Sequence, residues 1–185
     1  MSFSYKEDRL YVEDVALASV ARRYGTPCFV YSRAVIESNY RAYRDAFAER
    51  THQVCYSVKA NGNLAVLDVL ARLGASFDIV SEGELERVRV AGGNLQTVTF
   101  AGVGKTRQEL ESALAANISC FNVESIEEIE LLAEVAIGLG VQAPVAIRVN
   151  PDVDPQTHPY ISTGLNENKF GIPMHQALEV YRRVT

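Results

Sequence analysis

The sequence predicts an α/β fold, in the form of a partial (β/α)8 barrel, a TIM-like barrel with about five parallel βα units. Short runs of β-branched and aromatic residues recur along the chain, and stretches with apolar residues at helical spacing separate them. The 185 residues, 48% of them hydrophobic, are enough to fill one core. Because βαβ crossovers are right-handed, this alternation predicts a parallel sheet with its helices outside.

The expected elements follow from these patterns. The strands are expected at 54–58, 76–80, 97–101, 119–123 and 145–149, and the helices at 64–73, 83–91, 107–116, 126–139 and 174–183. The rhythm fits both a barrel and an open doubly wound sheet, but no Gly-x-Gly-x-x-Gly follows the first strand, which disfavours dinucleotide binding. A closed barrel needs eight strands, so we expect an open sheet edge after the fifth strand, through which the chain could self-associate.

The chain before the first barrel strand divides at residue 25. Residues 1–25 predict a hairpin, with strands at 3–5 and 10–12, and then a helix from Val15 to Tyr24 capped by Asp14. Residues 26–185 predict the α/β part, which opens with a short strand at 28–31 and a helix from Ser32 to about residue 50. The apolar face of that helix is expected at Ile36, Tyr40, Tyr43 and Phe47.

Composition excludes several classes of partner. The net charge is −5, and the absence of long blocks of like charge makes nucleic acid an unexpected partner. Neither a secretory signal nor an apolar run of membrane-spanning length is present in the sequence, so no membrane partner is expected. Cys28, Cys55 and Cys120 form no C-x-x-C pair, which favours free thiols in a reducing cytoplasm and no metal site.

Lys59 is the main candidate for chemistry. Val54, Tyr56 and Val58 alternate with small residues, and the turn signal Asn61-Gly62 ends the strand just after the lysine. The carboxyl ends of barrel strands carry active sites, and partial burial there lowers the pKa of a lysine toward its nucleophilic neutral form. The alternative is an ordinary surface lysine in a loop.

Three other signals have structural or weaker interpretations. Residues 102–106 hint at a phosphate-binding P-loop, but Thr99 stands where its first glycine belongs, which disfavours a nucleoside triphosphatase. Residues 151–170 predict a long loop of the kind that often carries function. Five acidic residues predict a solvated helix face, namely Glu124, Glu127, Glu128, Glu130 and Glu134.

Four segments, in order, resemble the motifs of the fold-type III pyridoxal-phosphate-dependent decarboxylases, whose members act on ornithine, arginine or diaminopimelate. The segments are Tyr56-Ser-Val-Lys-Ala-Asn61, Phe77-Asp-Ile-Val-Ser-Glu-Gly-Glu-Leu85, Arg148-Val-Asn-Pro151 and Lys169-Phe-Gly171. Each motif alone is weak, but four in the family's order are specific. The wording of residues 148–172 is most similar to the members that act on meso-2,6-diaminopimelate.

The resemblance implies a function and a set of site residues. Lys59 is implied to form the Schiff base with pyridoxal 5'-phosphate, Asp78 and Glu84 to line the cofactor pocket, and Arg148 to reach the ring. The implied reaction is decarboxylation of an amino acid, meso-2,6-diaminopimelate in the first place, to L-lysine. An ornithine- or arginine-type decarboxylase and a non-catalytic pyridoxal-phosphate-binding regulator are the alternatives.

Each of these site residues also has a structural interpretation. Asp78 could be a buried carboxylate bound by backbone donors, and Glu84 a first-turn residue favoured by the helix dipole. Arg148 could be the ion-pair partner of an acid at a strand end.

The resemblance also implies that part of the family's machinery lies outside these residues. In the family, the histidine stacked on the cofactor, the phosphate-binding glycines, the carboxylate at the pyridine nitrogen, the catalytic cysteine and the substrate-binding tyrosine all come later in the chain. We therefore expect an amino-terminal part of a chain about twice as long, inactive by itself. Residues 1–25 are expected to join the family's β-rich second domain, and the full enzyme is expected to be a homodimer.

Overall fold

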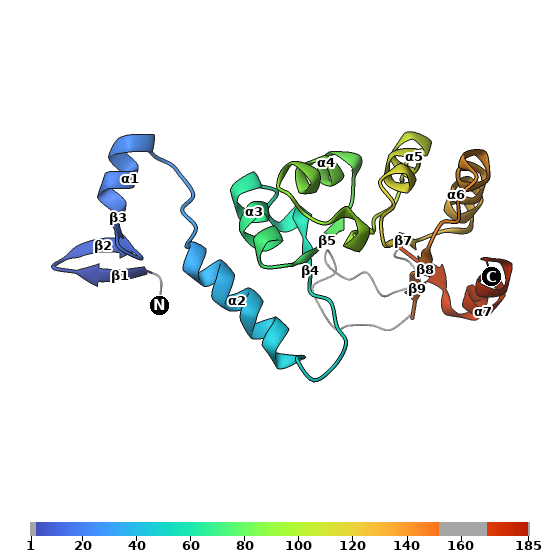
Figure 1. Ribbon diagram of the computed structural model, residues 1–185, viewed down its shortest axis with the longest axis horizontal. Helices are drawn as coiled ribbons and strands as arrows, with labels where there is room; N and C mark the ends of the chain where they lie inside the picture. The colour runs from blue at the N-terminus through green and yellow to red at the C-terminus, as the bar shows by residue number, and fades with distance from the viewer. Residues whose placement is uncertain (1–2, 152–169, 185) are drawn as a thin grey trace.

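The core of the molecule is a parallel sheet with the strand order β4-β5-β6-β7-β8, seen in the computed structural model, which describes residues 3–151 and 170–184 (Figure 1). All four neighbouring pairs are parallel. This order and direction confirm the predicted α/β class. The strands are β4 (Cys55–Ser57), β5 (Ser76–Ile79), β6 (Thr99–Phe100), β7 (Cys120–Val123) and β8 (Val145–Ile147).

The helices between the strands follow one another along one side of the sheet (Figure 1). A doubly wound sheet carries helices on both faces, so this arrangement is that of a barrel segment. The four helices predicted between the strands are confirmed to within one residue at each end, and their observed bounds are α3 (Leu64–Arg72), α4 (Glu82–Val90), α5 (Arg107–Ala115) and α6 (Ile126–Leu139). The preceding helix α2 (Arg33–Ala46) ends earlier than the predicted end near residue 50, and it packs against α3.

The two faces of the sheet differ in polarity. Phe77, Phe100 and Phe121 face the helices and are fully buried, and each stabilises the fold by about 1.5–3 kcal/mol. The residues that alternate with them are polar, for example Asp78 and Thr99, which lie side by side in register. Parallel strands covered on both faces are apolar throughout, so this alternation marks the polar face as the inner face of a barrel.

The sheet continues past the fifth strand. After Arg148 the chain forms β9 (Val149–Asn150), which pairs in parallel with β10 (Ile172–Pro173), and α7 (Met174–Val184) follows. The open edge expected after the fifth strand is therefore partly paired, which corrects that prediction. The predicted loop at 151–170, including Lys169, lies almost entirely outside the described residues.

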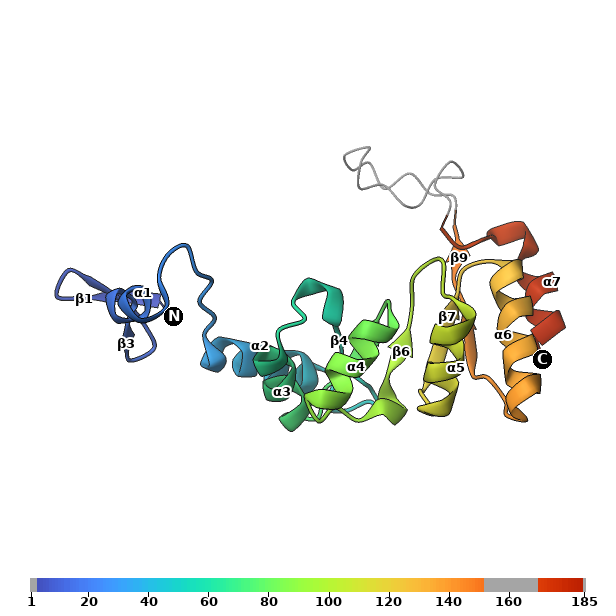
Figure 2. The same cartoon turned by 90° about the horizontal axis from the view of Figure 1, so that it is seen from above.

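The amino-terminal residues form a separate small unit, which stands apart from the α/β part (Figure 2). The predicted hairpin is confirmed as β1 (Phe3–Lys6) and β2 (Arg9–Val12). A third strand, β3 (Val15–Ala16), pairs with β2, so α1 (Leu17–Tyr24) begins two residues later than predicted. Its N-cap is Ala16 instead of Asp14, because strand pairing takes the residues expected in the first helical turn.

The connection between the two parts is irregular. The strand predicted at 28–31 is absent from the described structure, because this segment has no neighbouring strand to pair with. A carboxylate makes the link instead: Glu13 accepts hydrogen bonds from the Ser32 hydroxyl at 2.7 Å and the Ala34 N–H at 2.9 Å. Ser32 in turn caps α2, as the sequence predicts, by accepting the N–H of Val35.

Candidate active site

Lys59 lies just beyond the carboxyl end of β4, in the single 3-10 turn η1 (Val58–Ala60). Val58 before it is buried at 1% exposure and anchors the turn, whereas Lys59 itself is exposed. Asn63 then caps α3 by accepting the N–H of Ala65 at 2.9 Å. Within the described residues Lys59 has neither a hydrogen bond nor an ion pair, so its amine is available to a ligand.

Asp78 lies on the neighbouring strand and faces the inner side of the sheet. Its carboxylate accepts the hydroxyl of Ser57 on β4 at 3.2 Å and the hydroxyl of Thr99 on β6 at 3.4 Å. These partners come from the strands on either side, with which Asp78 is in register. Asp78 is thus bound by side-chain hydroxyls instead of the backbone donors of the structural interpretation.

Glu84 holds the turn between β5 and α4. Its carboxylate accepts the N–H of Val80 at 2.8 Å, and its own N–H donates to the hydroxyl of Ser81, the N-cap of α4. Glu84 lies in the first turn of α4, where the helix dipole favours a carboxylate. The structural interpretation of Glu84 is therefore present in the molecule, and Glu84 acts on the backbone that follows Asp78.

Arg148 lies between β8 and β9, at the same edge of the sheet. Its guanidinium donates to the carboxylate of Glu124 at 2.9 Å and lies over the ring of Phe170, 5.4 Å from the centroid. Arg148 and Asp78 share the lining of one hollow of about 390 Å³. Lys59 and Glu84 do not line it. Residues that line this hollow include Asp78, Ala101, Asn122, Glu124, Ala146 and Arg148.

Three charged residues of this edge were not predicted as part of a site. Glu124 and Glu128 are buried, which corrects the prediction that both belong to a solvated helix face. Glu127, Glu130 and Glu134 are exposed, as predicted. The reason is Lys105, the lysine of the segment that resembles a P-loop, whose buried ammonium lies 2.6 Å from Glu128. One signal pointed to Glu124: it directly follows the apolar strand β7.

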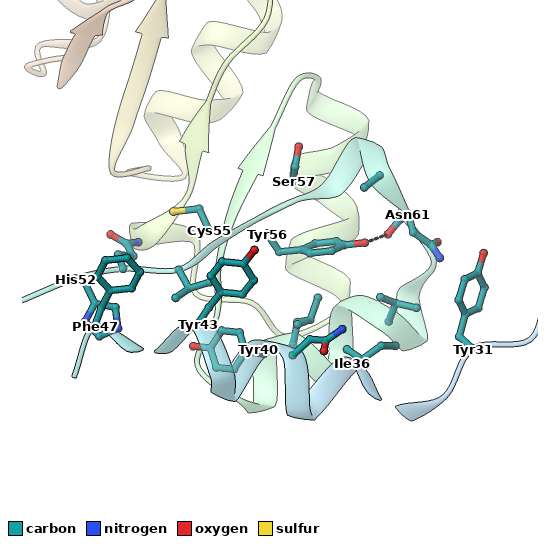
Figure 3. A pocket seen from close by; sticks show the side chains of 16 residues that line it. Tyr31, Ile36, Tyr40, Tyr43, Phe47, His52, Cys55, Tyr56, Ser57 and Asn61 are labelled. Carbon is teal, nitrogen blue, oxygen red and sulfur yellow. Dashed lines mark hydrogen bonds between the residues drawn. The ribbon is translucent and has the colours of Figure 1, made fainter. Parts of the chain in front are cut away.

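A second, apolar hollow of about 820 Å³ lies between α2 and β4 (Figure 3). Tyr40 and Tyr43 enter it from the predicted apolar face of α2, and Tyr56 from β4 donates its hydroxyl to the carbonyl of Asn61 at 3.3 Å. Burial, chiefly, and the nearby charge of Asp78 raise the pKa of the Cys55 thiol at its margin. None of the four predicted site residues lines this groove, whereas Asp78 and Arg148 both line the polar hollow, so the polar hollow is the better candidate site.

Two classes of site find no support in the part of the chain that the structure describes. No cluster of histidine, cysteine and acidic side chains there could hold a metal ion. Among those same residues, no helix combines the length and the apolar character needed to cross a bilayer.

Comparison with known proteins decides the family. Residues 33–185 match the family described as "Pyridoxal-dependent decarboxylase, pyridoxal binding domain". This match covers most of the chain and begins at the first residue of α2. The chain belongs to this pyridoxal-dependent decarboxylase family. The family assignment confirms the resemblance predicted from the four motifs.

Sequence relatives that are 44–63% identical to this chain share the name diaminopimelate decarboxylase. A diaminopimelate decarboxylase of Pseudomonas aeruginosa is 63% identical over 98% of this chain and 44% of its own length. The solved diaminopimelate decarboxylase of M. jannaschii in complex with L-lysine has a TM-score of 0.91 and 38% identity over 99% of this chain and 44% of that one. The Helicobacter pylori enzyme, also with L-lysine, has a TM-score of 0.87 and 41% identity over 90% and 42%.

The chain thus spans less than half the length of these pyridoxal-dependent decarboxylases.

Proposed function

We propose that these residues form the cofactor-binding part of a pyridoxal-phosphate-dependent decarboxylase that converts meso-2,6-diaminopimelate to L-lysine and CO2. The observation that carries the proposal is the exposed amine of Lys59 at a strand end, in a chain 63% identical to a diaminopimelate decarboxylase. Asp78 on the adjacent strand and Arg148 supply opposite charges at the same edge.

The residues present fit the phosphorylated pyridoxal group. The aldehyde of the pyridoxal group condenses with an accessible primary amine, and the exposed Lys59 supplies such an amine. The polar hollow at the same edge of the sheet is lined by short side chains such as Ala101 and Ala146 and by the charged side chains of Asp78 and Arg148. When bound, the cofactor supplies the electron sink for the loss of CO2.

The chain's own residues have separate tasks in this proposal. Lys59 would hold the cofactor through its amine and could donate a proton at the substrate's α-carbon. Asp78, which accepts hydrogen bonds from Ser57 and Thr99, would help to orient the cofactor, and Arg148 would supply positive charge beside it. Glu84 shapes the pocket from the turn after β5.

Substrate choice rests on the relatives. Sequence relatives that are 44–63% identical to this chain are diaminopimelate decarboxylases, and two solved structures at 38% and 41% identity contain L-lysine, the product of the proposed reaction. These observations favour diaminopimelate over ornithine or arginine.

A chimera tests the proposal. Residues 1–185 would replace the equivalent part of the Pseudomonas aeruginosa relative, and the purified protein would be mixed with pyridoxal phosphate, reduced with borohydride and digested. In the reduced and digested sample we expect a pyridoxyl group on Lys59. In a separate, untreated sample we expect release of lysine from meso-2,6-diaminopimelate. Lys59→Ala should abolish both the modification and the activity, while Lys6→Ala, at an exposed lysine far from the sheet, should change neither. Modification of another lysine with activity retained would contradict the assignment.

The 185 residues alone are proposed to lack decarboxylase activity and to bind the cofactor weakly or not at all, because they span 44% of the relatives. A stoichiometric visible absorption band of lysine-bound pyridoxal phosphate in the isolated chain, lost in Lys59→Ala, would contradict this.

The isolated chain is also proposed to self-associate. Among the described strands β4 pairs with β5 alone, and the apolar groove beside it includes the exposed side chains of Tyr43 and Phe47. Such an edge favours pairing with a second copy. Light scattering that shows a monomer at high concentration would count against it.

Assembly and location complete the proposal. We propose that the full-length enzyme is a homodimer, with residues 1–25 joined to its β-rich second domain. The exposed Tyr5 and Tyr24 of the amino-terminal unit support the presence of a further packing partner. The three free cysteines support a reducing, cytoplasmic compartment.

A further inference from the structure

Four charged side chains form a continuous cluster at the carboxyl ends of β6, β7 and β8. They are Lys105, Glu124, Glu128 and Arg148, two positive and two negative. The side chains of Lys105, Glu124 and Glu128 are 1%, 2% and 8% exposed, whereas that of Arg148 is 42% exposed. The cluster therefore has an interior, closed to water, and one arm that reaches the hollow shared with Asp78.

Lys105 is the fixed end of the cluster. Its ammonium donates to Glu128 at 2.6 Å, to the carbonyl of Gly102 at 2.7 Å and to the carbonyl of Asn122 at 2.9 Å. An ammonium has three N–H donors, so all of them are used. A buried charge is tolerated only when it is paired and hydrogen-bonded in this way, and such a group has little freedom to move.

Glu124 is the link between that fixed end and the arm. One carboxylate oxygen accepts the N–H of Gly102 at 3.0 Å, and the other accepts Arg148 at 2.9 Å. The backbone N–H of Glu124 donates to the second oxygen of Glu128 at 3.3 Å. Both the backbone and the side chain of Glu124 are thus tied to groups that contact Lys105.

The arm is also held from a third direction. Ile172 donates its N–H to the carbonyl of Arg148 at 2.7 Å, and Gly171 lies so close that a Cβ there would be 2.9 Å from the same carbonyl oxygen. The ring of Phe170 lies under the guanidinium. The backbone of Arg148 is therefore fixed, and Glu124 selects the direction of its long side chain.

We propose that Glu124 is a positioning residue of the cofactor site, which acts through Arg148 and is itself held by the Lys105–Glu128 pair. The inference rests on the proposed function, since Arg148 is taken to contact the cofactor. An arginine with four side-chain torsions loses conformational entropy whenever it binds a ligand. A buried carboxylate that already holds one rotamer removes part of that cost, so the bound cofactor gains affinity.

A double-mutant cycle in the chimera tests this. The dissociation constant of pyridoxal phosphate would be measured by titration for the unchanged chimera, Glu124→Gln, Arg148→Gln and the double variant. We expect Glu124→Gln to weaken binding about tenfold when Arg148 is present and less than about twofold when it is already Gln. A carboxylate that served stability alone would have the same effect in both backgrounds, and that result would overturn the proposal.

A matched control and a cofactor-free readout complete the design. Glu134→Gln removes an exposed ion pair with Arg107, which joins α6 to α5. This variant should leave the dissociation constant unchanged. In the protein without cofactor, the side-chain Nε–H resonance of Arg148 should be single and sharp, and it should broaden in Glu124→Gln. An unaltered resonance in Glu124→Gln would also overturn the proposal. If that variant does not fold, Glu124→Asp takes its place in the cycle.

The outcomes separate this inference from the proposed function. If Arg148→Gln leaves cofactor binding unchanged, the proposed role of Arg148 fails and the inference fails with it. If Arg148→Gln weakens binding and Glu124→Gln does not, the proposed function stands and only the inference fails.

Discussion

The two lysines at strand ends, Lys59 after β4 and Lys105 after β6, have opposite environments. Lys59 lies in the 3-10 turn η1, is exposed, and has no partner among the described residues. Lys105 is 6% exposed as a residue and donates three hydrogen bonds, one of them to Glu128. Both belong to the edge of the sheet where barrels keep their chemistry.

The difference shows that lysines at one edge of a sheet can have different roles. A lysine whose donors are all used by the protein contributes structure, because any ligand would first have to displace those bonds. A lysine without such bonds can react with an aldehyde. The charged cluster of Lys105, Glu124 and Glu128 holds Arg148 through Glu124, so the edge combines an exposed amine at Lys59 with a held guanidinium.

Loss of the buried amine should have the largest effect on stability. Lys105→Met should lower the free energy of unfolding of the 185-residue chain by about 3–5 kcal/mol, because it leaves Glu128 buried and unpaired. Lys59→Met should change it by less than about 0.5 kcal/mol, as is usual at exposed positions. Urea titration of both variants at neutral pH measures the contrast.

The exposed pair between Arg107 and Glu134 is the control for that contrast. It has the same 2.6 Å separation as the buried pair, with side chains 51% and 67% exposed. Arg107→Met should therefore cost no more than about 1 kcal/mol. Equal losses in Lys105→Met and Arg107→Met would mean that burial does not distinguish the two pairs.

Chemical reactivity should separate the two lysines next. With a limiting amount of an amine-acetylating reagent, Lys59 should react about 100-fold faster than Lys105, whose modification requires local opening of its hydrogen bonds. Mass spectrometry of the digested chain gives both rates in one sample. Lys6, which is exposed and joined to Asp14 by a surface ion pair, is the internal reference and should react at a rate close to that of Lys59. Comparable rates at Lys59 and Lys105 would remove the basis of the comparison.

The part of the site around Lys59 could be predicted from the sequence because it depends on the order of neighbouring elements along the chain. A strand, a lysine, a turn and a capped helix follow one another along the chain, and parallel strands bring their carboxyl ends to one edge. The helix Ile126–Leu139 was predicted with its observed bounds for the same reason. Asp78 and Arg148 were expected at the cofactor because of the resemblance to the decarboxylase motifs, and in the structure both line one hollow.

The charged cluster of Lys105, Glu124, Glu128 and Arg148 could not be predicted in full because it depends on contacts between distant segments. The acidic residues of α6 look alike in the sequence, and only the position of Lys105 on the neighbouring segment decides which is buried. One local signal existed, since Glu128 is on the same helical stripe as the buried Leu132 and Val135. The late start of α1 has the same kind of cause, because pairing between β2 and β3 determines it.

A substitution of Gly171, which lies beside Arg148, should have a smaller and more specific effect on the packing around that arginine. Gly171 has φ +83°, and an added Cβ would meet a backbone oxygen that cannot move aside. Gly171→Ala should cost about 1–3 kcal/mol in the free energy of unfolding. Gly138→Ala in α6, where a Cβ meets nothing within 4 Å, is the control and should stabilise by up to about 1 kcal/mol. A neutral Gly171→Ala in urea titration would show that the approach to Arg148 is not tight.

The smallest expected effect concerns the helix that follows Lys105. Glu109 completes the capping box of α5 by accepting the N–H and hydroxyl of Thr106, both at 2.9 Å. The backbone N–H of Thr106 is the main cause that lowers the pKa of Glu109 below its ordinary value of 4.5. Its stabilising contribution is therefore complete above the unfolded-state pKa and is lost as the pH falls through the folded-state pKa.

Glu109→Gln should cost about 1 kcal/mol at neutral pH. Because protonation removes the same charge from the unchanged protein, the difference between the two proteins should shrink as the pH is lowered below about 4.5. Thermal unfolding midpoints over a series of pH values measure this. A difference that stays constant into the acid range would mean that the Glu109 charge does not contribute to the cap.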